Sequence, residues 1–276
     1  MRRVGKGRWL AEVALPVFPA VFLGVLAMAW ADVSPLLWGQ QAAAWALLSL
    51  LALPLRRAVG RIPALVSGAL LLIILAASLF GQAVGGARRW VDLVVFHANA
   101  AQLIIPALLV LLGKMTCPYP ALMGAAVVLG LQPDLSQLAA FCAAACVILW
   151  QRREDKCRTL GCAVILCACM LRCLTVPVVI EPVAYCEGIL TMLAGRSIML
   201  WAAGWIALAL VPAWWMQRFI RQDEPRALIL ALYYAAGLLF VVSGKYPVAF
   251  MGFGLSPIAG YMLACAFCDA DSKGAA

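Results

Sequence analysis

The sequence is a succession of long apolar runs, separated by short stretches that carry charges, prolines or glycines. A helix needs about 20 apolar residues to cross the hydrocarbon core of a bilayer. Apolar residues make up 66% of the 276 positions and charged residues only 12%, whereas soluble domains have about 45–50% and about 25%. One soluble core could not bury this excess. The sequence therefore excludes a soluble enzyme and a disordered chain, and predicts an integral membrane protein.

The apolar runs predict an all-α polytopic bundle of about ten transmembrane helices in a single membrane domain, residues 1–276. The expected spans are 12–30, 39–55, 62–81, 96–113, 118–132, 135–150, 160–180, 187–215, 227–243 and 248–268. The fifth and sixth are short and meet at Pro133–Asp134, which can place polar groups at membrane depth. The 187–215 run is long enough to hold a non-spanning segment before a helix at about 197–215. The basic N-terminus resembles a signal peptide, but we interpret it as a retained first helix.

The net charge of +9 reflects topology. Sixteen of the 21 Lys and Arg residues fall into clusters on one side of this arrangement. The clusters are Arg2/Arg3/Lys6/Arg8, Arg56/Arg57/Arg61, Lys114, Arg152/Arg153/Lys156/Arg158, Arg218/Arg221/Arg226 and Lys273. Because cytoplasmic loops carry an excess of basic residues, both chain ends are expected in the cytoplasm. The acidic residues in these loops, such as Glu224, are expected to be solvated.

Five basic residues depart from this pattern, because they lie on the outer side or within the membrane: Arg88, Arg89, Arg172, Arg196 and Lys245. The carboxylates at or between the outer ends of spans are Asp134, Glu181 and Glu187. Ionisable groups near the membrane are costly and usually face a partner or a cavity. Arg172 is a functional candidate on this ground, although its side chain could simply extend to the interface.

The segment 85–93, GGARRWVDL, combines two glycines with Arg88, Arg89, Trp90 and Asp92 on the outer side. Guanidinium groups bind phosphate through paired hydrogen bonds, and tryptophan anchors at the headgroup level. The segment can therefore bind an anion. It can equally form a plain interfacial loop in which one arginine pairs with Asp92.

Most of the 11 cysteines lie inside apolar runs, where cysteine behaves as a small hydrophobic residue. With His97 as the single histidine, the chain lacks the ligand set of a typical metal site. We therefore expect the cysteines to pack in the core.

Three motifs resemble those of the FtsW/RodA/SpoVE (SEDS) family. Residues 86–93 resemble the G-A-x-R-W loop that precedes the fourth helix of that family. Residues 131–135, LQPDL, resemble its Q-P-D-L-G-T motif between the fifth and sixth helices. Residues 247–256 resemble its P-L-P-F-I-S-Y-G-G-S stretch before the last helix. The motifs follow the order of the family, and the resemblance extends from about the second helix to residue 268.

The resemblance implies a protein of the bacterial inner membrane that polymerises the glycan strand of peptidoglycan from a lipid-linked disaccharide precursor, lipid II. It implies a class B penicillin-binding protein as partner, in cell division or in maintenance of cell shape. It also implies a catalytic aspartate in the large outer loop between the seventh and eighth helices. No cofactor is implied, and a divalent cation on the pyrophosphate stays open.

The chain departs from the family at positions that carry charge. The glutamate and lysine of the family's fourth helix become Gln102 and Ile105 in this chain. Both charges are lost together, as expected for an ion pair that is tolerated only intact. The Gly-Thr after the motif aspartate becomes Ser-Gln at 136–137. The outer loop after the seventh helix shortens to 178–187, and Glu187 best matches the catalytic aspartate. A longer carboxylate can still act as a base, but a misplacement of about 1 Å can cost about a hundredfold in rate.

Three functions are consistent with these features. The first is a divergent glycosyltransferase with Glu187 and Asp134 as catalytic residues. Its expected substrate-binding residues are Arg88, Arg89, Trp90, Arg172, Arg196 and Gln132. Arginines suit this role because negative charge develops on the pyrophosphate leaving group. The second function is a catalytically impaired scaffold or lipid-precursor-handling protein of the same fold. The third is an unrelated small transporter with Asp134 and Glu187 as proton or ion sites.

Overall fold

The computed structural model describes residues 6–93, 96–178 and 181–270, and these residues are mostly helical. The helices are α1 (Lys6–Ala14), α2 (Phe18–Trp30), α3 (Pro35–Val59), α4 (Ala64–Ala77), α5 (Ala100–Lys114), α6 (Tyr119–Leu131), α7 (Leu135–Gln151), α8 (Lys156–Thr175), α9 (Ile189–Arg196), α10 (Ile198–Gln222), α11 (Pro225–Val241) and α12 (Leu255–Asp269). A 3₁₀ turn, Ser78–Phe80, follows α4, and β1 (Trp90–Leu93) pairs with β2 (Phe96–Asn99) in an antiparallel hairpin. The prediction of an all-helical polytopic protein is confirmed.

Each predicted apolar run contains a helix of the bundle. Three helices, α3, α8 and α10, are long and apolar enough to cross a membrane, and α1 with α2 forms a fourth span if the bent pair counts as one. The remaining upright helices are apolar but shorter, and α6 has only 13 residues. At a rise of about 1.5 Å per residue, such a helix covers roughly 20 Å of a core about 30 Å thick.

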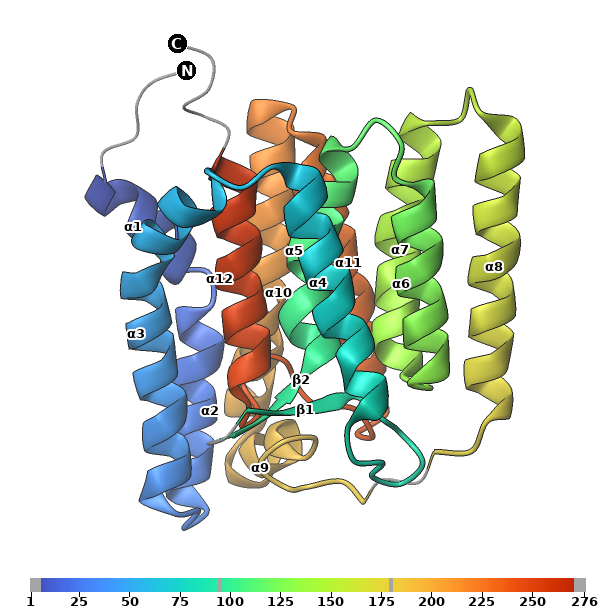
Figure 1. Ribbon diagram of the computed structural model, residues 1–276. Coiled ribbons are helices and arrows are strands. Elements are labelled where there is room, and N and C mark those ends of the chain that lie inside the picture. Colours follow the sequence, from blue (N-terminus) through green and yellow to red (C-terminus); the bar gives the residue numbers. More distant parts are fainter. Residues whose placement is uncertain (1–5, 94–95, 179–180, 271–276) are drawn as a thin grey trace.

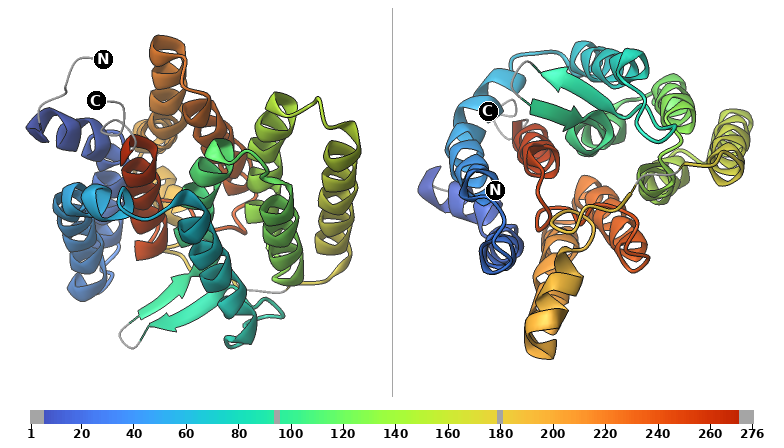
Figure 2. Two further views of the ribbon diagram at one scale, coloured as in Figure 1. Left: turned by 45° about the horizontal axis from the view of Figure 1, so that its top comes forward. Right: turned by 90° about the horizontal axis from the view of Figure 1, so that it is seen from below.

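Helix ends that carry basic residues gather at one end of the bundle (Figure 1). This basic end holds Arg56 at the end of α3, Lys114 at the end of α5, Arg152 after α7 and Arg218 in α10. The opposite end, here called the outer end after the predicted topology, holds the β1–β2 hairpin, α9 and the loop between α11 and α12 (Figure 1). Figure 2 shows α8 at the edge of the bundle, where it packs against α6 and α7. The clusters at Arg2, Arg3 and Lys273 lie outside the described residues.

Four predicted spans differ from the observed helices, and proline accounts for two of the differences. The 12–30 run breaks after Ala14, before the prolines at 16 and 19, into two helices bent by 53°. The 160–180 run ends at Thr175, because a residue before Pro177 disfavours helical backbone.

The other two predicted spans begin with non-helical backbone at the outer end. Residues 96–99 are a strand of the hairpin, so the predicted 96–113 helix starts only at Ala100. Residues 248–254 form a loop, so the predicted 248–268 helix starts only at Leu255. The predicted short segment before the eighth span is confirmed as α9, which ends at Arg196 before α10 begins.

Helix α12 packs against α5 through direct contact of the two backbones. A Cβ atom on Gly260 would lie 2.1 Å from the carbonyl oxygen of Gln102 and 2.9 Å from that of Leu103. Only a residue without a side chain fits at this point. The contact is surrounded by fully buried side chains, among them Tyr261, Ile105 and Leu108.

A cluster of charged side chains ties α12 to its neighbours at the basic end. Arg218 contacts both Asp269 and Glu224, whose side chains are each only 12% exposed. The indole of Trp9 donates a hydrogen bond of 2.8 Å to Asp269, which joins α1 to α12. Arg56 donates to the carbonyl of Asp269 and lies over the Trp9 ring. The expectation that Glu224 is solvated is therefore wrong, because the helices close around it.

We predict that Gly260→Ala lowers the melting temperature of the purified protein, because the new methyl group must push α12 away from α5. Overpacking of this kind costs about 1–3 kcal/mol. The matched control is Gly161→Ala in α8, where nothing lies within 4 Å of the added Cβ and alanine favours the helix. Equal melting temperatures for the two variants would contradict the close contact.

Candidate functional site

A buried ion pair joins the hairpin to α7 at the outer end. The Arg89 guanidinium donates through Nη1 to Asp134 Oδ2 at 3.1 Å, and the two side chains are 7% and 1% exposed. Asp134 is also the N-cap of α7, since its Oδ1 accepts from the backbone of Gln137 and from the hydroxyl of Ser136 at 2.8 Å. One carboxylate thus starts a helix and neutralises a buried arginine.

The hairpin holds Arg89 in place for this pair. The carbonyl of Arg89 accepts from the backbone of Ala100 at 2.9 Å, directly where α5 begins. The guanidinium lies 4.9 Å from the centre of the Trp90 ring, in a cation–π contact. Its Nε is buried and has no hydrogen-bond partner among the described residues. The Arg89 Nε is therefore a buried donor that the described residues leave unsatisfied.

The starts of α5, α7 and α12 meet beside this pair. Asn99 caps α5 by accepting from the backbone of Gln102 at 3.1 Å, and its own N–H donates to the hydroxyl of Ser256 at 2.9 Å. Helix N-termini carry partial positive charge, so their meeting favours negative or electron-rich groups. The hairpin was missed from the sequence, because the apolar run hides the strand that precedes α5.

Two other predicted site residues, Gln132 after α6 and Arg172 in α8, make their contacts near the end of α6. Gln132 is fully buried and donates to the hydroxyl of Ser78 and to the carbonyl of Leu75, which ties α6 to α4. Its side-chain oxygen has no partner in the described part of the chain. Arg172 donates to the carbonyl of Gly130, near the negative end of the same helix. Arg172 therefore finds a backbone partner within the bundle.

The remaining predicted residues each bind nearby backbone. Arg88 is exposed and donates to the carbonyl of Leu79 at 3.1 Å. Arg196 donates to the carbonyl of Trp30. Glu187 is half-buried and accepts from the backbone of Val183 at 2.8 Å, within its own turn. The structure therefore brings together Arg89, Trp90 and Asp134, and it gives the other predicted residues separate partners. One alternative from the sequence was that an arginine of this segment pairs with Asp92. The structure pairs Arg89 with Asp134 instead.

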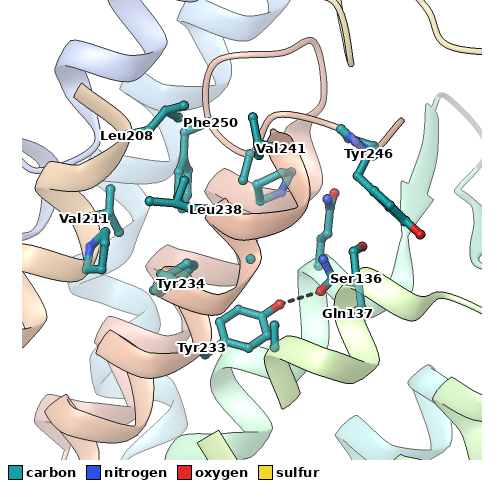
Figure 3. Close-up of a pocket in the computed structure, with 17 residues that line it drawn as sticks. Ser136, Gln137, Leu208, Val211, Tyr233, Tyr234, Leu238, Val241, Tyr246 and Phe250 are labelled. Carbon is teal, nitrogen blue, oxygen red and sulfur yellow. Dashed lines mark hydrogen bonds between the residues drawn. The ribbon is translucent and has the colours of Figure 1, made fainter. Parts of the chain in front are cut away.

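A cavity of about 50 Å³ opens beside the pair, between α5, α7, α10 and α11 (Figure 3). Its polar lining comes from Gln102, Ser136, Gln137, Tyr233 and Tyr246, and Tyr233 donates to Gln137 Oε1 at 2.6 Å. None of the residues predicted as catalytic or substrate-binding lines it.

The sequence gives weak signals for the residues of this cavity. Gln102 and the Ser-Gln at 136–137 stand out as departures from the family motifs. Tyr233 was missed, because a tyrosine inside the predicted span 227–243 looks like packing, and Tyr246 was missed, because a tyrosine between two spans looks like part of the interfacial belt. Burial raises the pKa of the Tyr246 phenol, and the nearby Asp134 carboxylate raises it further. Tyr246 therefore links the cavity to the ion pair.

The loop of residues 246–254, here called the roof loop, closes the outer side of the cavity. Gln41 of α3 is fully buried and holds this loop through three hydrogen bonds: its Nε2 donates to the carbonyls of Phe250 and Gly252, and its Oε1 accepts from the backbone of Gly254. Phe250 has φ +68°, which is unfavourable for a residue with a side chain. The roof loop is therefore held in a conformation that its own sequence would not favour.

The roof loop also contacts the turn that carries Glu187. Val248 donates to the carbonyl of Cys186 at 3.2 Å, and Phe253 donates to the carbonyl of Tyr185 at 2.9 Å. Gly252 approaches Cys186 so closely that a Cβ would lie 2.4 Å from its carbonyl oxygen. The 183–188 turn and the cavity therefore share one wall. In the described parts of the chain, no three His, Cys, Asp or Glu side chains are placed to hold a metal ion.

We predict that Asp134→Asn destabilises the protein by about 3–5 kcal/mol, because it leaves the buried Arg89 without a counter-ion. Asparagine is also a good N-cap, so the start of α7 is preserved. The matched control is Asp155→Asn, which changes the N-cap of α8 beside an exposed Arg158 and should cost less than about 1 kcal/mol.

A double-mutant cycle of Arg89→Gln and Asp134→Asn, followed by thermal unfolding, measures the coupling. Strictly additive effects would show that the pair does not contribute as a unit.

Comparison with known proteins places this geometry in a known fold. No family model matches the sequence, and no curated relative matches it. Among solved structures, the chain is similar to the rod shape determining protein RodA of Thermus thermophilus, with a TM-score of 0.64 and 20% identity over 95% of both chains. A point mutant of the same RodA matches with the same TM-score and identity, over 95% of this chain and 96% of that one. The chain therefore has the polytopic membrane fold of RodA, a protein of the family that its motifs resemble.

Proposed function

We propose that this chain is a SEDS-type protein of the bacterial inner membrane, acting on lipid II in peptidoglycan synthesis as a divergent glycan-strand glycosyltransferase. The observation that carries the proposal is the RodA fold over 95% of both chains, combined with three SEDS-like motifs in the order of that family. Two of the motifs, at 86–93 and 131–135, contribute the two sides of the Arg89–Asp134 pair.

In this proposal Glu187 is the general base. Its carboxylate has one hydrogen bond from the backbone of Val183, and a carboxylate has about four acceptor positions. The free positions can take the proton of an acceptor sugar hydroxyl. The hydroxyl oxygen then forms the new bond to the anomeric carbon of the donor, and the lipid pyrophosphate leaves with the electron pair of the broken bond. The 183–188 turn suits this role because the roof loop fixes it next to the cavity.

The pyrophosphate needs positive charge on the outer surface. Arg88 is exposed, and its guanidinium can bind one phosphate through paired hydrogen bonds. Arg89 is buried and paired with Asp134. In this scheme Asp134 holds Arg89 and the start of α7 in place, and it acts as a positioning residue rather than as a base.

A second candidate function is a lipid-precursor-handling protein without catalysis. It is favoured by the loss of the family ion pair: Ile105 is fully buried among apolar side chains, and Gln102 lines the cavity without a charge. Under either function, a class B penicillin-binding protein of the same membrane is the proposed partner.

We predict that Glu187→Gln lowers polymerisation of lipid II by about a hundred- to ten-thousand-fold, the usual contribution of a general base. The measurement uses the purified full-length protein with its penicillin-binding partner, and gel analysis of the glycan strands.

The matched control is Glu181→Gln, which changes an exposed acid of the same outer segment and should leave the rate unchanged. Wild-type polymerisation by Glu187→Gln would remove Glu187 from the mechanism. Absence of polymerisation by the wild-type protein, where other SEDS proteins are active, would favour the second candidate.

A further inference from the structure

A groove of about 360 Å³ runs along α10, on the side that faces the bend between α1 and α2. Its lining consists of Leu15 and Pro16 from the bend and of Leu210, Ala213, Trp214 and Gln217 from α10. The groove shares no lining residue with the cavity under the roof loop. It is therefore a separate feature of the basic half of the bundle, and the proposed function makes no use of it.

The bend after α1 leaves this flank of α10 uncovered. Helix α2 packs against α10, but α1 is turned by 53° and lies at the basic end out of line with α2 (Figure 1). There it is held by α3 and α12: the Trp45 indole donates to the carbonyl of Ala14 at 3.3 Å, and the Trp9 indole donates to Asp269. Because α1 does not continue along α10, the Leu210 side chain stays 40% exposed and Gln217 is exposed as well.

The polarity of the groove rises toward the basic end. Helical residues three or four positions apart lie on the same face, so one stripe of α10 holds Leu210, Trp214, Gln217 and Arg221. Along this stripe an aliphatic side chain is followed by an indole, then by an amide, and in the last turn of α10 by a guanidinium. The matching ligand is apolar over most of its length and carries an acceptor and an anion at one end.

The guanidinium at the end of the stripe is available for such an anion. Arg218, one turn earlier, is bound by Asp269 and Glu224 and points into the bundle. Arg221 is exposed and has no ion-pair partner among the described residues. The two arginines of one helix end therefore differ in role, because the first closes the bundle and the second faces outward with its charge uncompensated.

The length of the stripe matches one leaflet of a bilayer. Helix α10 is one of the helices long and apolar enough to cross a membrane. At about 1.5 Å per residue, the stretch from Leu210 to Arg221 covers roughly 16 Å, about half of a hydrocarbon core about 30 Å thick. Arg221 therefore lies at the level of the lipid headgroups when Leu210 lies near the middle of the membrane.

We propose that this groove binds one anionic glycerophospholipid of the leaflet at the basic end. An acyl chain lies against Leu15, Leu210 and Trp214, and the Gln217 amide donates to an ester oxygen near the glycerol. The Arg221 guanidinium binds the phosphate through paired hydrogen bonds. Basic residues near the membrane surface attract anionic lipids, and the basic end as a whole adds to this preference. The lipid holds the α1–α2 bend against α10, a contact that the protein alone leaves open.

Native mass spectrometry of the full-length protein tests the proposal. The protein in detergent is given equal amounts of phosphatidylglycerol and phosphatidylcholine with the same acyl chains. We expect one phosphatidylglycerol per protein to be retained, with a preference of about fivefold, as one arginine near the membrane surface predicts. Equal retention of the two lipids would overturn the proposal. So would a dimer in place of the lipid-bound monomer, because a second copy of the chain would then be the occupant of the groove.

A pair of arginine variants locates the headgroup. Arg221→Gln should abolish the preference for phosphatidylglycerol without lowering the melting temperature, because Arg221 has no ion-pair partner among the described residues. Arg57→Gln is the matched control, since Arg57 is also exposed and lies in the last turn of a helix of 25 residues, but on α3 and away from the groove. It should keep the preference. An unchanged preference in Arg221→Gln would overturn the assignment of the headgroup.

A groove-filling variant locates the acyl chain. Ala213 lines the groove, so Ala213→Trp should lose the retained lipid, while Ala168→Trp, at an exposed alanine of the spanning helix α8, should keep it. A phosphatidylglycerol with a diazirine in its acyl chain should label residues 210–217 in the wild type, and much less in Ala213→Trp. A lipid that stays bound to folded Ala213→Trp would overturn the proposal. These measurements involve no polymerisation, so their outcome and that of the Glu187 test are independent.

Discussion

The contact between α5 and α12 at Gly260 determines where the polar groups of the outer end can lie. Because the two backbones touch, the first turns of α5 and α12 also lie close together, and the backbone of Asn99 can donate to Ser256. The same contact places Gln102, one turn into α5, at the wall of the cavity. A side chain at position 260 would separate the helices and with them these groups. A glycine in the middle of a helix, which usually weakens it, is here the condition for assembling the site.

Charge in this protein is kept at the ends of the helices and out of the space between them. At the basic end, Arg218, Glu224 and Asp269 neutralise one another around the end of α12. At the outer end, Arg89 and Asp134 form a pair beside a cavity whose own lining is neutral. Buried pairs of this kind add little net stability, because each ion must be taken out of water. The arrangement places a buried ion pair beside a cavity that is lined without charge.

Three distant parts of the sequence cooperate to hold the roof loop. Gln41 from α3 satisfies three backbone groups of that loop, and Gly24 from α2 leaves room for Met251, since a Cβ there would lie 2.0 Å from its carbonyl oxygen. The turn around Cys186 binds it from the other side. These contacts compensate for the unfavourable backbone of Phe250. The acid at position 187 is thereby coupled to the wall of the cavity, although α10 and α11 separate the two in sequence.

The sequence by itself determined the membrane class, the helical runs, the basic end and the three motifs, because these follow from composition, from run length and from local residue order. It also singled out Asp134 and Arg89 as residues in unusual places, although it could not pair them, since 44 positions separate the two along the chain. Only the tertiary structure decided that Arg89 pairs with Asp134, that residues 96–99 form a strand, and that Gln102, Tyr233 and Tyr246 share a cavity. The physical reason is that apolar periodicity reports burial of a helix in lipid or protein, whereas partnership among polar groups depends on which helix ends meet.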